Sequence, residues 1–357
     1  MILLTGATGF IGGLVLEALS KRNVQVRCLV RKPVVSVNPN ISYVTGDVLD
    51  QESLLKATAG VDTVYYFIHM MGKQKEQENF DILDRKAVTN MVKACKENGV
   101  KRIIHLTGIT NPGEKLSHHL SSRKEVEDII RSSGIDYTIF RASMIIGRGG
   151  GAFEILDTAV RKFPIIPVFN WGNTHVQPVY IGDVLRYLVE CLDKKETINK
   201  CYDIGCSEVF TYQELMQEYA RHLGLKRIFV HIPGSWHRIS SLVLGRLSTV
   251  NANVVYWLIE SLRNNMVCEP NDLKKIFGFG PLSFKESIRK LVEKTKKETY
   301  DFIALTSSSI LPFTSPTCST IVPVTIMSAP ALTRSLAVAC GETITFFPID
   351  TTPITEA

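Results

Sequence analysis

The first thirteen residues, MILLTGATGFIGG, constrain the fold more strongly than any other stretch of the chain. An apolar run at 2–4 precedes glycines at every third position, Gly6, Gly9 and Gly12, and residues 14–19 then favour a helix. A strand that enters such a turn leaves the first N–H groups of the next helix unpaired, where the positive end of the helix dipole favours a pyrophosphate. The stretch therefore predicts a dinucleotide site.

Each glycine has a separate predicted role. Gly6 permits the turn, Gly9 lets phosphate oxygens approach the backbone, and Gly12 lets the helix pack close to the strand. We expect three further residues of the turn to contact the cofactor: Thr8, Phe10 and Ile11. A surface loop with incidental glycines is the alternative, but the position directly between a strand and a helix favours nucleotide binding.

Strands and helices alternate along the chain after this turn. We expect strands at 24–30, 41–44, 62–68, 102–106 and 137–140, and helices that include 76–97 and 120–133. Short connections between alternating elements are typical of an α/β fold with a Rossmann-type doubly wound parallel sheet. Residues 1–150 are therefore predicted to form an NAD(P)-binding domain.

The pattern changes beyond residue 150. Residues 151–298 are predicted to form a smaller substrate lobe, with a strand near 200–205 returning to the Rossmann sheet. Within it, we expect Asp183 to cap the helix that follows, and Thr211 with Glu214 to form a capping box. Residues 299–357 are rich in Ser, Thr and Pro, which predicts a weakly ordered tail rather than a membrane span.

The end of the second strand indicates which dinucleotide is bound. Related folds place an acidic residue there to bind the ribose of NAD, whereas this chain carries Arg31 and Lys32. Because a guanidinium pairs well with phosphate oxygens, we predict NADP(H), with NAD(H) or a merely solvated strand end as the alternatives. Asp47 and Val48 are placed to contact the adenine, unless Asp47 only caps a turn.

The carboxyl ends of the later strands face the expected ligand crevice. Ile68, His69 and Thr107 occupy these ends, so we include them among the cofactor-binding residues. His69 is a candidate polar contact, with a purely structural role as the alternative.

Composition argues against several other classes of protein. The net charge of +6 is mild and the basic residues are dispersed, which does not favour nucleic acid binding. The eight cysteines occur singly, and no His cluster has metal-ligand spacing, so we expect reduced thiols, no metal and a cytoplasmic location. We also expect no signal peptide, because the first strand starts at residue 2.

Several segments together resemble the extended, atypical short-chain dehydrogenase/reductase superfamily: TGATGFIG at 5–12, LVRKP at 29–33, GDV at 46–48 and QPVYIGDV at 177–184. HHLSSRKEVEDIIRSSG at 118–134 is similar to NAD(P)H-binding proteins of the nucleoside-diphosphate-sugar epimerase-like and NmrA-like groups, and to the accessory Rossmann subunit of respiratory complex I. The resemblance covers residues 1–297. It implies a dinucleotide cofactor and oxidoreductase or epimerase-like activity on a small molecule.

The chain departs from the superfamily where catalysis takes place. Active members use a Tyr, which transfers a proton to or from the substrate oxygen, and a Lys four residues later. The Lys lowers the pKa of the Tyr and holds the nicotinamide ribose. Glu127 falls where the helix of the family usually has a Glu. Counting back from it puts His119 in the Tyr position and Arg123 in the Lys position, and Thr107 falls where active members usually have a hydroxyl partner. The resemblance thus implies His119 and Arg123 as catalytic candidates, against the alternative of an exposed helix start without chemistry.

Two functional hypotheses remain at this point. The first is an NADP(H)-dependent oxidoreductase, epimerase or dehydratase acting on an unknown small molecule. The second is a non-catalytic NADP(H)-binding sensor or assembly protein with a protein partner, which the missing Tyr-x-x-x-Lys pair favours.

Overall fold

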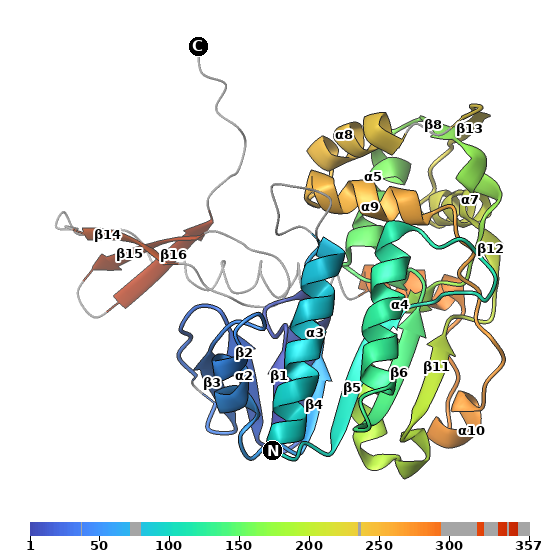
Figure 1. The fold of residues 1–357 in the computed structure, drawn as a ribbon. Helices are drawn as coiled ribbons and strands as arrows, with labels where there is room; N and C mark the ends of the chain where they lie inside the picture. The colour runs from blue at the N-terminus through green and yellow to red at the C-terminus, as the bar shows by residue number, and fades with distance from the viewer. Residues whose placement is uncertain are drawn as a thin grey trace. The chain divides into compact units, whose positions relative to one another are not determined.

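A parallel sheet of seven strands forms the centre of the computed structural model (Figure 1). In spatial order its strands are β11 (Lys200–Ile204), β6 (Asp136–Ala142), β5 (Arg102–Gly108), β4 (Thr63–Tyr66), β1 (Ile2–Thr5), β2 (Val26–Val30) and β3 (Ile41–Thr45). Most residues of β1, β2, β4 and β5 are buried, as expected for strands covered on both faces. The predicted Rossmann-type doubly wound sheet is confirmed.

The structure describes residues 1–36, 38–71, 80–234, 237–293, 320–324, 335–340 and 343–348. The chain divides into two compact units, Met1–Arg289 and Lys290–Ala357. In the second unit, three strands form an antiparallel sheet: β14 (Thr320–Val324), β15 (Ser335–Cys340) and β16 (Thr343–Pro348). The rest of the predicted tail at 299–357 lies outside the described residues, and the predicted boundaries at 150 and 298 stay predictions.

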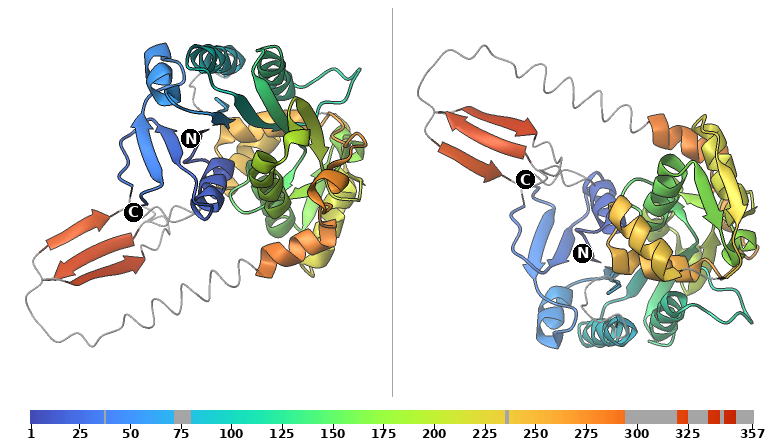
Figure 2. Two further views of the ribbon diagram at one scale, coloured as in Figure 1. Left: turned by 90° about the horizontal axis from the view of Figure 1, so that it is seen from below. Right: turned by 90° about the horizontal axis from the view of Figure 1, so that it is seen from above.

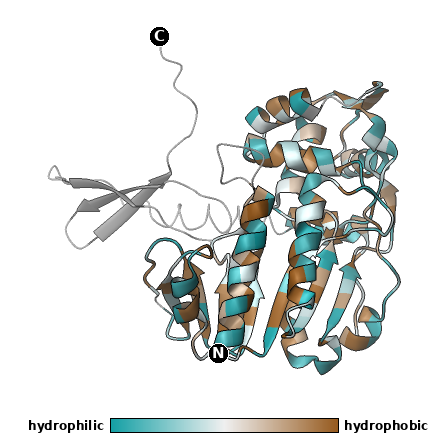
Figure 3. Cartoon of the chain, in the orientation of Figure 1, coloured by the Kyte–Doolittle hydropathy of each residue, from teal (hydrophilic) through white to brown (hydrophobic). Residues whose placement is uncertain are grey.

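Two layers of helices cover the two faces of the large sheet (Figures 1 and 2). One layer holds α1 (Phe10–Ser20) and α6 (Ile181–Glu190), and the other holds α2 (Gln51–Thr58), α3 (Phe80–Glu97) and α4 (His118–Arg131). Strand side chains alternate between the layers, so that Leu4 and Tyr65 pack in one core, whereas Leu3 and Tyr66 pack in the other. Hydrophobic and hydrophilic residues likewise alternate along α3 and α4 (Figure 3).

A group of shorter elements lies beyond the carboxyl ends of the sheet strands (Figure 1). It contains α5 (Gly151–Lys162), β8 (Ile165–Val168), η1 (Asn170–Asn173), α7 (Tyr212–His222), β13 (Ile228–His231), α8 (His237–Leu247) and α9 (Ala252–Ser261). The unit also contains β7 (Ile145–Ile146), β9 (His175–Val176), β10 (Val179–Tyr180), η2 (Cys191–Asp193), η3 (Lys195–Thr197), β12 (Phe210–Thr211) and α10 (Leu273–Phe277). Among the described residues, no helix combines the length and apolar character needed to cross a bilayer.

The two capping predictions have different outcomes. The capping box of Thr211 and Glu214 at the start of α7 is confirmed, because both of its hydrogen bonds are present. The capping role of Asp183 is wrong: Tyr180 is the N-cap of α6, and Asp183 accepts the backbone N–H of Leu282 at 2.8 Å. A carboxylate near a helix start can thus accept a hydrogen bond from a backbone N–H far away in the chain, which the local sequence does not reveal.

A buried histidine in β5 makes the stability of the fold sensitive to acid. His105 is fully buried, and its Nδ1 lies 2.7 Å from the carbonyl oxygen of Tyr66. Its Nε2 has no hydrogen-bond partner among the described residues. Burial lowers the pKa of His105 from 6.5 to about 3, so the folded protein holds this side chain neutral.

We predict that unfolding becomes easier as the pH falls from about 7 to about 5, because unfolded His105 takes up a proton that the folded protein excludes. This loss amounts to about 1.4 kcal/mol for each pH unit below the unfolded pKa. His105→Gln should give a flatter dependence of the unfolding free energy on pH, measured by urea titration. The exposed control His175→Gln should keep the wild-type slope; an equally steep slope in His105→Gln would contradict the assignment.

Candidate active site

The glycine turn brings the start of α1 against the end of β1. Gly6 has a φ of +70°, and a Cβ there would lie 2.8 Å from the carbonyl oxygen of Phe67. A Cβ on Gly12 would lie only 2.1 Å from the carbonyl oxygen of Gly6, which also accepts the Gly9 amide at 2.8 Å. The turn therefore requires glycine at 6 and 12 for its own packing.

The first turn of α1 has the features of an anion site. Gly9 is the N-cap, no side chain caps the helix, and no acidic residue lies in its first turn. Thr8 and Gly9 are exposed, whereas Phe10 and Ile11 are half-buried, and Phe10 packs against Gly147 and Gly150. The unpaired amides and the positive dipole end fit a pyrophosphate, so these residues would hold the phosphates of a bound dinucleotide.

The residues predicted to contact the adenosine end lie after β2 and β3. Arg31 and Lys32 are exposed, and neither forms an ion pair with a carboxylate of the described residues. Asp47 accepts the Leu49 amide at 2.9 Å through Oδ1, which is the turn-capping bond considered as the alternative. Val48 is buried beneath it. Their roles in cofactor binding stay predictions.

A buried carboxylate holds the residues that follow β4. Asp84 on α3 accepts hydrogen bonds from the Met70 amide at 2.8 Å and the Ser122 hydroxyl at 3.0 Å, and its Oδ2 lies 2.7 Å from His69 Nδ1. Burial alone would raise the pKa of Asp84, but its hydrogen bonds with His69 and Met70 keep that pKa below its ordinary value. Ile68, next to His69, packs in the core on the α3 side of the sheet.

His119 and Arg123 lie one turn apart on the same side of α4. The His119 ring centroid is 5.1 Å from that of His69, and His119 Nδ1 lies 3.1 Å from the hydroxyl of Ser261 on α9. The Arg123 guanidinium donates to the Leu106 carbonyl at the end of β5, and the Thr107 hydroxyl donates to the Arg123 carbonyl at 3.4 Å. The structure thus brings His69, Thr107, His119 and Arg123 together.

Burial determines the protonation of the two histidines. It lowers the pKa of His119 well below the ordinary value, and the neighbouring His69 and Arg123 lower this pKa further. Burial also lowers the pKa of His69, although Asp84 acts in the opposite direction. Both rings are therefore neutral at neutral pH.

The neighbouring His118 differs from His119. Its side chain is 42% exposed, and its ring stacks on Trp257 at a centroid distance of 5.2 Å. The alternative of an exposed helix start therefore describes His118, but not His119.

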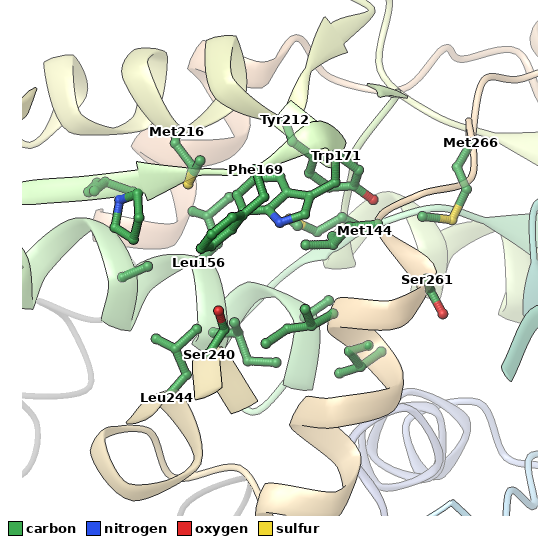
Figure 4. Close-up of a pocket in the computed structure, with 18 of the residues that line it drawn as sticks. Met144, Leu156, Phe169, Trp171, Tyr212, Met216, Ser240, Leu244, Ser261 and Met266 are labelled. Carbon is green, nitrogen blue, oxygen red and sulfur yellow. The ribbon is translucent and has the colours of Figure 1, made fainter. Parts of the chain in front are cut away.

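A cavity of about 490 Å³ begins where β5 and β6 end. Gly108 and Ser143 lie at this end, together with His119 and Ser261. The other walls come from α5, η1, α7, α8 and α9 and are largely apolar, as Figure 4 shows. Apolar lining residues labelled in Figure 4 include Met144, Leu156, Phe169, Trp171, Met216 and Leu244. The cavity therefore offers a group of polar residues at one end of a largely apolar space.

Sequence reasoning missed Asp84, Ser261 and the cavity. A signal for Asp84 was present, because a carboxylate occupies the apolar stripe of α3 between Phe80 and Ala87. Ser261 and the apolar walls carry no such signal, since apolar helix faces look the same whether they fill a core or line a cavity. No group of three or more potential metal ligands occurs among the described residues.

Comparison with known proteins finds a matching family model and several relatives. A family model for NAD(P)H-binding proteins matches residues 6–163. Subunit 9 of the NADH dehydrogenase [ubiquinone] 1 alpha subcomplex from Arabidopsis thaliana is 26% identical over 226 residues, which cover 59% of this chain and 55% of that protein. In these comparisons the chain is similar to the atypical short-chain dehydrogenase/reductase superfamily. A nicotinamide dinucleotide is its cofactor.

Two further matches are to enzymes. Ceramide reductase from Caulobacter vibrioides is 25% identical over 239 residues, covering 65% of this chain and 74% of that protein. The structure of NADPH-dependent quinone oxidoreductase QOR2 from Escherichia coli superposes with a TM-score of 0.64 at 19% identity, covering 82% of this chain and all of that chain. The chain spans 60% or less of the length of several other relatives.

Gly12 offers a test of the turn beside a matched control on the same helix. We predict that Gly12→Ala weakens NADPH binding by about tenfold or more, because the new methyl group would collide with the Gly6 carbonyl and displace the turn. Gly13→Ala should bind normally, since its Cβ would lie 3.4 Å from the nearest backbone atom, at ordinary contact distance. Calorimetric titration measures both. Equal affinities would disprove the requirement for close packing at position 12.

Proposed function

We propose that the protein is an NADP(H)-dependent reductase that acts on a large, apolar carbonyl compound. One observation carries this proposal: the cavity is lined mainly by apolar side chains, and His119 and Ser261 lie together at its sheet end. A space of this size is typical of sites for ligands of drug-like size.

The apolar walls favour reduction over sugar-nucleotide epimerisation. A sugar diphosphate would bring many hydroxyl and phosphate oxygens against side chains that cannot pair with them, and each unpaired polar group costs about 1–3 kcal/mol. The names of the Caulobacter ceramide reductase and the E. coli quinone oxidoreductase agree with an apolar substrate.

The residues at the sheet end would orient and protonate the substrate oxygen. The bound dinucleotide would supply the hydride for the carbonyl carbon. His119 is neutral, and the Ser261 hydroxyl lies 2.9 Å from the Trp257 carbonyl, to which it donates, and 3.1 Å from His119 Nδ1. In the proposed reactive state the hydroxyl turns to donate to Nδ1, so that Nε2 carries the proton and becomes the donor for the substrate oxygen. A water molecule would return the proton to His119 after turnover.

His69 and Asp84 would act as positioning residues for this donor. Asp84 fixes His69 through a 2.7 Å contact, and the His69 ring in turn packs beside the His119 ring. The Arg123 guanidinium, one helical turn from His119, would contribute a positive charge near the cofactor ribose.

The preference for NADP(H) rests on the basic end of β2. Arg31 and Lys32 are exposed and would pair with a phosphate on the adenosine ribose. The cytoplasm, which the isolated cysteines favour, stays the proposed location.

The non-catalytic alternative is less well supported. The relatives include reductases and an epimerase, and the cavity ends at candidate polar groups. The similarity to complex I subunits keeps a protein partner as a second proposal alongside catalysis.

Replacing Arg31 tests the cofactor preference. Arg31→Ala should weaken NADPH binding by about 10- to 100-fold and leave NADH binding unchanged, because only NADPH loses a charge-assisted hydrogen bond. Calorimetric titration of both cofactors gives the ratio. Lys21→Ala, on an exposed side chain at the end of α1, is the control; equal losses for the two cofactors in Arg31→Ala would argue against a phosphate contact.

Replacing His119 tests the proton donor. With NADPH and either menadione or a long-chain ketone as the probe, His119→Phe should lower kcat by about 100-fold or more while NADPH binding stays intact. His118→Phe, on the adjacent exposed ring, should keep wild-type turnover because it lies outside the cavity. Full activity in His119→Phe would remove His119 from the mechanism, and no turnover in the wild type would count against the reductase.

A further inference from the structure

We propose that the end of the protein formed by α8, β8 and β13 docks on the surface of an anionic lipid bilayer. We call this surface the α8 face. Docking goes beyond the proposed function and does not depend on catalysis. Only its consequence, that an apolar substrate enters the cavity from the bilayer, rests on the proposed reductase.

Large apolar side chains are concentrated on the α8 face. Thirteen such side chains are exposed among the described residues, and seven of them lie here: Ile165, Ile228, Val230, Ile239, Leu242, Val243 and Leu247. Ile228 is 63% exposed and Leu242 is 54% exposed. Apolar residues gathered in this way mark an interaction surface, whereas single exposed ones do not.

A hydrogen bond from the end of α5 links the two parts of the α8 face. Ile165 of β8 pairs in register with Ile228 of β13, so their side chains are neighbours. Lys162, at the end of α5, donates from Nζ to the Leu247 carbonyl of α8 at 2.8 Å, which holds the start of β8 close to the end of α8. Figure 1 shows the three elements at one end of the unit Met1–Arg289, and the right-hand view of Figure 2 looks onto that end.

The charge of the α8 face has a single sign. Its two sequence segments, 158–182 and 223–259, contain no Asp or Glu. Lys226, Arg238 and Arg246 are exposed, and none of them pairs with a carboxylate of the described residues. Apolar side chains surrounded by unpaired cations fit the acyl boundary and anionic headgroups of a bilayer. A protein partner would have to present a surface that is both apolar and acidic.

α8 separates the α8 face from the cavity. Ile239 and Val243 are exposed and also line the cavity, while Ser240 and Leu244 face it from the same helix. An apolar molecule that left the bilayer would therefore pass only one helix to reach the sheet end. The apolar lining of the cavity and the apolar surface outside it are continuous through this helix.

Vesicle binding by the full-length protein tests the proposal. Wild-type protein should co-sediment with vesicles of phosphatidylcholine and phosphatidylserine, and much less with phosphatidylcholine alone. The double variant Leu242→Glu/Arg246→Glu should lower the partition coefficient by about tenfold or more. It replaces an apolar side chain and a cation with two negative charges, which the anionic headgroups repel. Neither residue lines the cavity, so NADPH affinity should be unchanged and would show that the variant is folded.

A matched control separates the α8 face from general charge effects. The double variant Ile82→Glu/Lys86→Glu also replaces an exposed aliphatic residue and a cation four positions later with two glutamates, on the exposed side of α3. It should bind vesicles like the wild type. Equal binding by the two double variants, or no preference of the wild type for anionic vesicles, would overturn the proposal. Association with a protein in place of vesicles would overturn it as well.

Hydride transfer measured on the same samples distinguishes the two proposals. Vesicle binding by the wild type without turnover of menadione or a ketone would contradict the proposed reductase and support the docking surface. Turnover without vesicle binding would support the proposed reductase and contradict the docking surface.

Discussion

The close approach of α1 to the end of β1 is the constraint on which the cofactor site depends. The 2.1 Å that would separate a Cβ on Gly12 from the Gly6 carbonyl leaves no room for any side chain. Because the helix starts so close to the strand, its first amides lie at the carboxyl edge of the sheet, where the ligand crevice of a doubly wound fold is found. The same edge receives α4 and the cavity, so the proposed cofactor and substrate sites lie side by side at this edge.

A second constraint acts at the end of the cavity. Asp84 is buried, and it joins its own helix, α3, to residues 69–70 and to Ser122 of α4. A buried carboxylate is stable only when its oxygens are hydrogen bonded, so these segments cannot move apart without a large cost. His119 gains a fixed neighbour in this way. Its neutral state follows from burial and from the positive charge of Arg123 nearby.

The sequence predicted the sheet accurately because its signals are local. The expected strands at 41–44 and 102–106 fall within β3 and β5, and the Thr211 capping box opens α7 as predicted. The capping prediction for Asp183 was wrong because its hydrogen bond is not local: Asp183 accepts the amide N–H of Leu282, about a hundred residues away. His118 and His119 are adjacent in sequence, yet only the packing of α9 against α4 leaves the first exposed and places the second in the cavity wall.

By itself the sequence determined the dinucleotide fold, because a glycine-rich turn between a strand and a helix has few structural solutions. The resemblance also implies that His119 and Arg123 stand at the positions of the superfamily's Tyr and Lys, which stays a prediction. Tertiary structure alone decided the apolar cavity, the Asp84 cluster and the α8 face. Each of these is made by residues far apart in the chain, and an apolar helix face has the same sequence pattern whether it meets a core, a ligand or a bilayer.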